Sequence, residues 1–261
     1  MKFIHLTDTH ALGAGRQLYG EDPVARLAAA VDSINGEHGD AAFVILTGDI
    51  THWGDPEAYA AFKAEVARLT MPLHLLIGNH DDTAAFSETF PDVPRDADGF
   101  VQTTFDTGLG RFLLLDTKAP KGHAGAYCAA RRAWLGARLA ESSGPLLLFM
   151  HHPPFPIGIA ALDRIMLQDA EAFHETLAPF KDRIRHLFLG HAHRAFFGNW
   201  RGISVSCMRG LNHQVALDLT SGPGRINANF EPPAYGVALL HDDRVVVHLH
   251  DFTDSSRRFA L

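Results

Sequence analysis

The chain has 261 residues, of which 46% are hydrophobic, and this composition supports one large domain, or one domain with an extension, around a full core. The net charge of −7 and the lack of a basic run argue against nucleic acid as a bulk partner. The chain has only two cysteines, which excludes a disulfide framework, and free thiols suit a reducing compartment.

The first predicted strand is residues 2–6, an apolar run that begins directly after Met1. It leaves no room for a signal peptide, and no apolar run in the chain is long enough to span a bilayer. We therefore expect a soluble, cytoplasmic protein without a membrane partner.

Strand and helix signals alternate up to about residue 193. Asp22-Pro23 and Asp55-Pro56 are typical helix starts, and apolar residues at helical spacing follow the first of them. Strands are expected at 43–46, 73–77, 101–105, 111–116, 146–150 and 187–189, and helices at 129–140 and 169–177.

After residue 193 the pattern changes to strands alone. We predict strands at 203–206, 215–219, 235–240 and 244–249, of which the last two form a hairpin, and a long loop at 220–233. Strands with helices outside them, followed by an all-strand section, favour two packed sheets flanked by helices. We expect a catalytic core of residues 1–200 and, within the same domain, a section of residues 201–261 whose strands complete the second sheet.

Five of the predicted strands end in a short motif that contains His, Asp or Asn. The motifs are Asp8-Thr9-His10, Gly48-Asp49, Gly78-Asn79-His80-Asp81, His151-His152 and Gly190-His191-Ala192-His193. Buried strands deliver such side chains to one edge of a sheet, where α/β folds bind their ligands. A single motif of this kind is usually an ordinary turn, but five in this order, each after an apolar strand, indicate a metal site.

The donor set predicts the kind of metal. The motifs offer oxygen and imidazole ligands and no thiolate, which argues against structural zinc and favours catalytic Zn, Mn, Fe or Co. The candidate ligands are too many for one open site and suit two ions that share a carboxylate, for which Asp49 is the candidate. They are Asp8, His10, Asp49, Asn79, His151, His191 and His193.

The charge of such a site is matched by a phosphodiester, although charge alone does not exclude a monoester. Two divalent ions and two aspartates leave a net charge of about +2, which a hydroxide and a diester monoanion would neutralise. His80 follows the candidate ligand Asn79 and would project toward substrate instead. An imidazole in that place can bond a phosphate oxygen or protonate a leaving alkoxide.

Together the five motifs resemble the complete signature of the calcineurin-like metallophosphoesterases. The wider sequence, including Leu18-Tyr19-Gly20, GDITHWGDPEAY, GNHDD and MHHPPFPIG, resembles the bacterial class III cyclic-nucleotide phosphodiesterases and the related glycerophosphodiesterases, and His213-Gln214-Val215 resembles a stretch of the latter. The resemblance implies an α/β fold, a four-layer α/β/β/α sandwich of two mixed sheets with a C-terminal β extension.

The resemblance also implies roles for individual residues. Asp8, His10 and His193 would bind the first metal ion, Asn79, His151 and His191 would bind the second, Asp49 would bridge the two, and His80 would contact the phosphoryl group. Leu18, Tyr19 and His213 are expected to line the substrate pocket. The implied reaction is attack of a metal-bound hydroxide on a small phosphodiester.

One residue departs from the family pattern. Many members carry Asp or Asn three residues after the bridging aspartate, where that residue orients the phosphate-contacting histidine, but this chain has His52. Asp55 or Asp81 could take over that role, or His52 could accept a hydrogen bond as a neutral imidazole.

Several alternatives stay open from the sequence. The shared motifs do not separate cyclic nucleotides from glycerophosphodiesters, and a phosphomonoesterase or phosphonate monoester hydrolase of the same fold is the main rival. A non-catalytic metal-binding scaffold is a second rival, but the presence of every ligand and of His80 argues against it. The late apolar hairpin would leave an exposed edge unless it were paired, so we expect a homodimer or a higher homo-oligomer.

Overall fold

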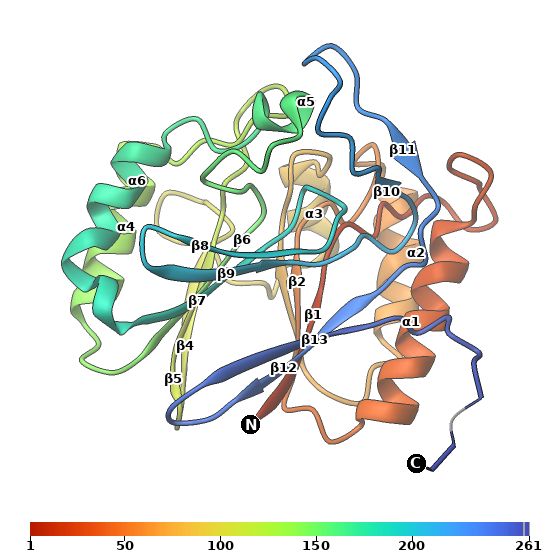
Figure 1. The fold of residues 1–261 in the computed structure, drawn as a ribbon, viewed down its shortest axis with the longest axis horizontal. Coiled ribbons are helices and arrows are strands. Elements are labelled where there is room, and N and C mark those ends of the chain that lie inside the picture. Colours follow the sequence, from red (N-terminus) through yellow and green to blue (C-terminus); the bar gives the residue numbers. More distant parts are fainter. Residues whose placement is uncertain (258, 261) are drawn as a thin grey trace.

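The computed structural model describes residues 1–257 and 259–260, and these form two mixed β-sheets that pack face to face between helices (Figure 1). The first sheet has the order β13-β12-β1-β2-β3 and the second the order β4-β5-β6-β7-β9-β8. The strands of the first are β1 (Lys2–Leu6), β2 (Val44–Thr47), β3 (Leu73–Leu76), β12 (Tyr235–Leu240) and β13 (Val245–His250). Those of the second are β4 (Thr103–Thr107), β5 (Gly110–Leu115), β6 (Leu146–Met150), β7 (Ile184–Leu189), β8 (Phe196–Trp200) and β9 (Ile203–Cys207).

Helices cover the outer face of each sheet, which confirms the four-layer arrangement. Figure 1 shows α1 and α2 beside the first sheet and α4 and α6 beside the second. The helices are α1 (Pro23–His38), α2 (Pro56–Val66), α3 (Thr83–Thr89), α4 (Ala129–Ala140), α5 (Ala160–Asp163) and α6 (Ala170–Leu177), followed by a 3-10 turn at Ala178–Arg183. None of the helices in the described ranges has the length and apolarity to cross a membrane.

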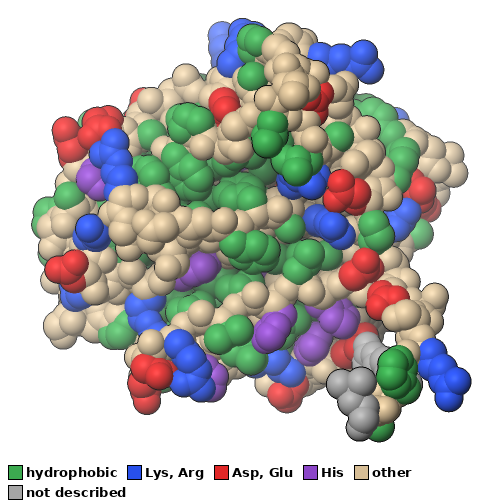
Figure 2. Space-filling view, in the orientation of Figure 1, with side chains coloured by type: hydrophobic (Ala, Val, Ile, Leu, Met, Phe, Trp, Pro, Cys, Tyr) green, Lys and Arg blue, Asp and Glu red, His purple; other side chains and the backbone are tan. Residues whose placement is uncertain are grey.

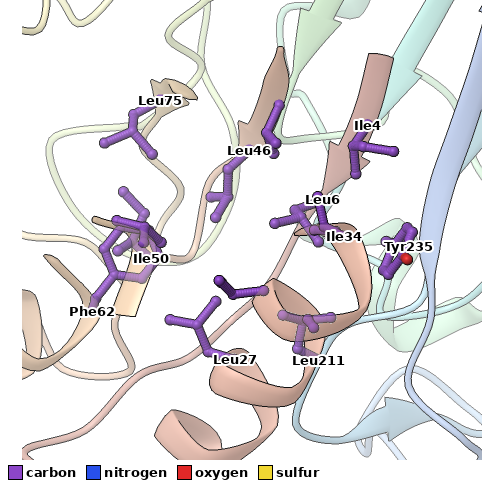
Figure 3. Close-up of a cluster of buried hydrophobic side chains, with 14 of the residues drawn as sticks. Ile4, Leu6, Leu27, Ile34, Leu46, Ile50, Phe62, Leu75, Leu211 and Tyr235 are labelled. Atoms are coloured by element: carbon purple, nitrogen blue, oxygen red, sulfur yellow. The ribbon is translucent and has the colours of Figure 1, made fainter. Parts of the chain in front are cut away.

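The layers are held together by separate apolar clusters. Between the sheets, Phe3 packs edge-on against Phe188, and the rings of Phe149 and Phe188 stack with their centroids 4.5 Å apart. Outside the first sheet, Figure 3 shows Leu27 and Ile34 of α1 facing Leu6 of β1 in a fully buried cluster. Both faces of the central strands are therefore buried, which explains why their sequences are continuous apolar runs.

The C-terminal section differs from the sequence-based expectation. Its strands divide between the two sheets: β9 joins the second, whereas β12 pairs with β1 and extends the first. The strand expected at 215–219 is only β10 (Gln214–Val215), which pairs with β11 (Ala228–Asn229). Asp218 ends β10 early because its carboxylate accepts bonds from the backbone of Thr220 and Ser221, a turn that competes with strand pairing.

The hairpin of β12 and β13 forms as predicted, and β13 is the edge of the first sheet. Homodimer formation through this hairpin stays a prediction.

Candidate metal centre

The five motifs converge at one end of the molecule, the upper end in Figure 1, where β1, β2, β3, β6 and β7 finish. Contacts between the loops join the two sheets there. His151, after β6, has its Nδ1 2.7 Å from the carbonyl of Thr47 in β2, to which it donates. The backbone N–H of His191, after β7, donates to Asp8 Oδ2 at 3.0 Å. The two sheets therefore contribute to one site.

The backbone of most candidate ligands lies in the left-handed region. This conformation costs roughly 1–2 kcal/mol for a residue other than glycine, and such strain is concentrated at functional sites. It turns the side chain at each strand end into the site instead of along the strand. The residues are Asp8 (φ 52°), His10 (φ 45°), Asp49 (φ 50°), His191 (φ 69°) and His193 (φ 46°).

Asp49 lies between two groups of candidate ligands. Its Oδ2 is 3.6 Å from His10 Nε2 and 3.3 Å from His151 Nε2. Its Oδ1 accepts the backbone N–H of His80 at 2.9 Å, which fixes the carboxylate. A Cβ on Gly78 would collide with this carboxylate, so only glycine fits beside it. One oxygen thus holds the side chain in place and the other faces both groups, as a bridging ligand must.

The first group is Asp8, His10, Asp49 and His193, whose ligand atoms all lie within 4.8 Å of one another. His193 Nδ1 donates to the carbonyl of His213, so its Nε2 is the nitrogen left for a metal ion. That nitrogen lies 3.2 Å from Asp8 Oδ1 and 2.9 Å from His10 Nε2. Asp8 Oδ1 is buried without a hydrogen-bond partner among the described residues. Acceptor atoms that face one another in this way fit a cation between them.

The second group repeats this arrangement. Because His151 Nδ1 donates to Thr47, its Nε2 is the nitrogen left for a metal ion, and that nitrogen lies 3.2 Å from Asn79 Oδ1. His191 Nε2 is buried and has no hydrogen-bond partner in the described part of the chain. The rings of His151 and His191 lie 5.1 Å apart. The donor set and its unpartnered atoms therefore fit a second ion that shares Asp49.

The titration of these groups agrees with a metal site. Burial lowers the pKa of His191 to about 3 and that of His10 well below its usual value, so both rings are neutral, as a metal ligand must be. For His151 burial acts in the same direction, but the Asp49 carboxylate outweighs it and raises the pKa to about 9. Without a metal, a proton on His151 thus balances Asp49, and metal binding would release that proton.

Asp81 supports the loops without facing the metal site. Its carboxylate accepts backbone N–H groups from Gly78 at 2.8 Å, Ile50 at 3.1 Å and Thr51 at 3.1 Å, and the hydroxyl of Tyr59 at 2.9 Å. The loops after β2 and β3, which carry Asp49 and Asn79, are thereby tied to one buried group.

We expect Tyr59→Phe to lower the free energy of unfolding by about 1–3 kcal/mol, because the Asp81 carboxylate loses a buried hydrogen-bond donor. Urea unfolding of the metal-loaded protein measures this change. Tyr235→Phe is the matched control: it removes a hydroxyl from another buried ring, but that hydroxyl bonds the neutral Ser33 side chain. Equal losses in the two variants would contradict the role given to Asp81.

His80 is oriented by a main-chain group. Its Nδ1 donates to the carbonyl of His52 at 2.8 Å, and the two rings stack with centroids 4.8 Å apart. The sequence offered Asp55 and Asp81 for this task, but the hydrogen bond to His80 Nδ1 is made by the His52 carbonyl. Asp81 instead accepts the N–H groups of the two loops. The His52 ring instead meets His10, with 2.9 Å between the Nδ1 atoms. Burial, followed by the nearby His80, lowers the pKa of His52 to about 4, so the ring is neutral, but it does not orient His80 as one of the predictions had it, because the contact to His80 comes from the His52 carbonyl.

A cavity of about 300 Å³ opens over the candidate ligands. Tyr19, His80 and His213, which the sequence suggests for the substrate pocket, line it. Leu18 does not: its side chain is buried, and its backbone pairs with Glu21 in a tight turn that leaves only Tyr19 exposed to the cavity.

Some lining residues carried no recognisable signal in the sequence. His123, in the loop after β5, has its Nδ1 2.9 Å from Nδ2 of the candidate ligand Asn79. It follows no apolar strand, so its position could not be inferred. The positions of a set of aliphatic residues in the cavity lining could not be inferred either, namely Leu162, Ile165, Val215, Ile226 and Ala228.

Known proteins share the sequence motifs and the fold described above. Residues 1–195 match the model of the calcineurin-like phosphoesterases. The chain is 46% identical, over all of its own length and 96% of the relative's, to a Rhodopseudomonas palustris protein named "Probable cyclic nucleotide phosphodiesterase". It is 32% identical to the glycerophosphodiester phosphodiesterase GpdQ of Enterobacter lignolyticus, over 82% of this chain and 79% of that protein. Among solved structures, a dimetal phosphatase from Danio rerio has the same fold, with a TM-score of 0.72 at 17% identity, covering 97% of this chain and 96% of that one.

Proposed function

Because this chain belongs to the calcineurin-like phosphoesterase family, we propose that it is a dinuclear metal-dependent hydrolase of small phosphodiesters. The observation that carries the proposal is the position of Asp49 Oδ2, which faces one group of ligands through His10 and the other through His151. The cavity beside this oxygen also contains His80, a group that can act on the substrate.

The residues at the site would hold two divalent ions of the Mn, Fe, Zn or Co type. Asp8, His10 and His193 would bind one ion, Asn79, His151 and His191 the other, and Asp49 both. Bound ions of this kind lower the pKa of a coordinated water and stabilise charge on a phosphoryl group. Family membership supports divalent metal, and the nitrogen and oxygen donors support this set of ions.

The role proposed for His80 follows from its fixed orientation. Since Nδ1–H donates to the carbonyl of His52, Nε2 is the nitrogen left for substrate. Through Nε2 the ring can bond a phosphoryl oxygen or, when protonated, give a proton to the leaving alkoxide. His213 and Tyr19 would contact the ester group that is retained, because both line the same cavity.

Two of the relatives carry the names of a probable cyclic nucleotide phosphodiesterase and a glycerophosphodiester phosphodiesterase, and we propose a substrate from these two classes of small diester. A direct test is hydrolysis of bis(p-nitrophenyl) phosphate with added Mn²⁺. Metal binding without turnover of any diester would leave only the scaffold interpretation. The unpaired thiols Cys128 and Cys207 suit a cytoplasmic location, which we propose as the compartment.

We expect Tyr19→Ala to raise KM for a diester by about threefold to tenfold, since a partly exposed ring contributes roughly 1 kcal/mol. The Tyr19 ring is 61% exposed and lies 5.0 Å from the His213 ring, where it can contact the retained ester group. A monoester lacks that group, so the ratio of kcat/KM values for diester over monoester should narrow.

The measurement is paired kinetics on a diester and a monoester that share one leaving group. Phe197→Ala is the control, because Phe197 of β8 is similarly exposed at 57% but does not line the cavity. If the unmodified protein hydrolysed the monoester as efficiently as the diester, the chain would be a phosphatase of the same fold.

A further inference from the structure

The cavity over the metal centre has two chemically different sides. One side is made of five of the candidate ligands together with four other histidines, namely His10, Asp49, Asn79, His191 and His193 with His52, His80, His123 and His213. The other is an apolar wall, defined here as Leu162 and Ile165, at and just after α5, together with Val215, Ile226 and Ala228 of the arm formed by residues 214–229. In Figure 1 this arm rises next to α5 above the ends of the central strands.

The apolar wall is fastened to the metal centre. The backbone N–H of Val215 donates to the carbonyl of His193 at 3.2 Å, and His193 Nδ1 donates to the carbonyl of His213 at 2.9 Å. Two hydrogen bonds therefore join the candidate ligand His193 to the residues at the start of the arm, one donated by each partner. Val215, the part of the wall nearest to this ligand in sequence, is consequently tied to the metal centre.

The far part of the arm is also held. The guanidinium of Arg164 donates to the carbonyl of Pro223 at 3.3 Å, which links the region of α5 to the tip of the arm. Asp218 accepts from the Asn227 side chain at 2.7 Å, and the backbone N–H of Ala216 donates to the carbonyl of Asn227 at 2.8 Å. Both hydrogen bonds involve Asn227, the residue after Ile226, and so hold this part of the arm.

The wall offers a ligand neither charge nor side-chain hydrogen bonds, since all five of its side chains are aliphatic. Across the whole cavity, the described lining residues include no Lys or Arg, and Asp49 is the only carboxylate among them. Figure 2 shows hydrophobic side chains on the arm at the top of the view, and Ile226 remains 42% exposed. A partly exposed apolar surface at the rim of a polar site is typical of a ligand-binding site.

We propose that the apolar wall is a subsite for an uncharged aromatic or aliphatic ester arm of the diester, and so sets substrate specificity. The inference rests on the proposed function, because it places the phosphoryl group among the imidazoles. A polyhydroxylated or ammonium-bearing ester arm would lose hydrogen bonds to water at this wall without replacement. The structure therefore favours diesters with a flat or apolar arm over those of glycerol or an amino alcohol.

Binding of inert analogues tests the wall apart from catalysis. Diphenylphosphinate and dimethylphosphinate carry the monoanionic centre of a diester but have P–C bonds that are not hydrolysed. By calorimetry on the Mn²⁺-loaded protein, we expect diphenylphosphinate to bind at least about tenfold more tightly, the usual scale of apolar pocket contacts. Ile226→Asn should reduce this preference by about threefold or more.

Leu217→Asn is the matched control. Leu217 is an exposed aliphatic residue of the same arm, at 61%, but it does not line the cavity, so the preference should be unchanged. A second measurement compares kcat/KM for butyl and glyceryl p-nitrophenyl phosphates, which share a leaving group and have arms of similar size. The butyl diester should be preferred, and Ile226→Asn should narrow the difference.

The outcomes distinguish the proposed subsite from the proposed hydrolysis of diesters. Equal affinity for the two phosphinates, or equal effects of Ile226→Asn and Leu217→Asn, would overturn the subsite. A phosphinate preference that depends on Ile226, without turnover of any diester, would support the subsite and refute the proposed reaction alone.

Discussion

Asp49→Ala is expected to abolish hydrolysis and to remove most of the bound metal. Asp49 Oδ2 is the one ligand atom placed beside both groups, at 3.6 Å from His10 Nε2 and 3.3 Å from His151 Nε2. Its loss takes a ligand from each ion and leaves their mutual repulsion uncompensated. Metal ions contribute several kcal/mol of transition-state stabilisation, so kcat should fall by at least about 10³-fold, at about 1.4 kcal/mol for each factor of ten.

Two measurements check this expectation: metal content of the purified variant and its activity on bis(p-nitrophenyl) phosphate over a range of Mn²⁺ concentrations. Asp116→Ala is the control for the loss of a buried carboxylate. Asp116 is also buried, but it accepts backbone N–H groups from Val101 and Lys118, away from the metal site. The Asp116→Ala substitution should lower the free energy of unfolding and leave the metal content unchanged. Near-normal activity of Asp49→Ala at saturating Mn²⁺ would sink the dinuclear assignment.

His80→Ala is expected to keep both ions and lower kcat by about 10²–10⁴-fold, the usual range for a general acid or base. His80 lines the cavity, and its Nδ1 is taken by the carbonyl of His52 at 2.8 Å, so Nε2 is the nitrogen available to substrate. The hydrogen bond that its backbone N–H donates to Asp49 survives the substitution. The bridging carboxylate should therefore stay in place.

The leaving group distinguishes the two actions open to His80. An alkoxide needs a proton as it departs, whereas p-nitrophenolate does not. A general acid predicts a larger loss of kcat for a dialkyl phosphate than for a p-nitrophenyl diester. Equal losses would mean that His80 binds the phosphoryl group instead. If the metal content fell together with the activity, His80 would have to be counted as a ligand.

Much of the site could be predicted because it lies where strands end. A buried strand can be recognised from four or five apolar residues, as at 146–150, and the residue after it must lie at the edge of the sheet. Helix starts were equally readable: Asp22 before Pro23 is the N-cap of α1, and its carboxylate accepts the backbone N–H groups of Val24 and Ala25.

The parts that could not be predicted are short elements and turns that leave no period in the sequence. The short helix α3 (Thr83–Thr89) has too few residues for a helical period to be visible. Leu18 and Tyr19 are adjacent and both apolar in part, but only the folded turn decides that the first is buried and the second exposed. The expected strand at 215–219 failed for a similar reason, because the bonds to Asp218 are not visible as a period in the sequence.

The two neighbours of β1 come from distant parts of the sequence. This strand lies between β2, made soon after it, and β12, which comes near the end of the chain. On the ribosome, Asp8 and His10 therefore follow a strand that is paired on one side only until residues 235–240 have emerged. The complete pairing of β1, the strand that precedes Asp8 and His10, therefore depends on a segment that is made long after it.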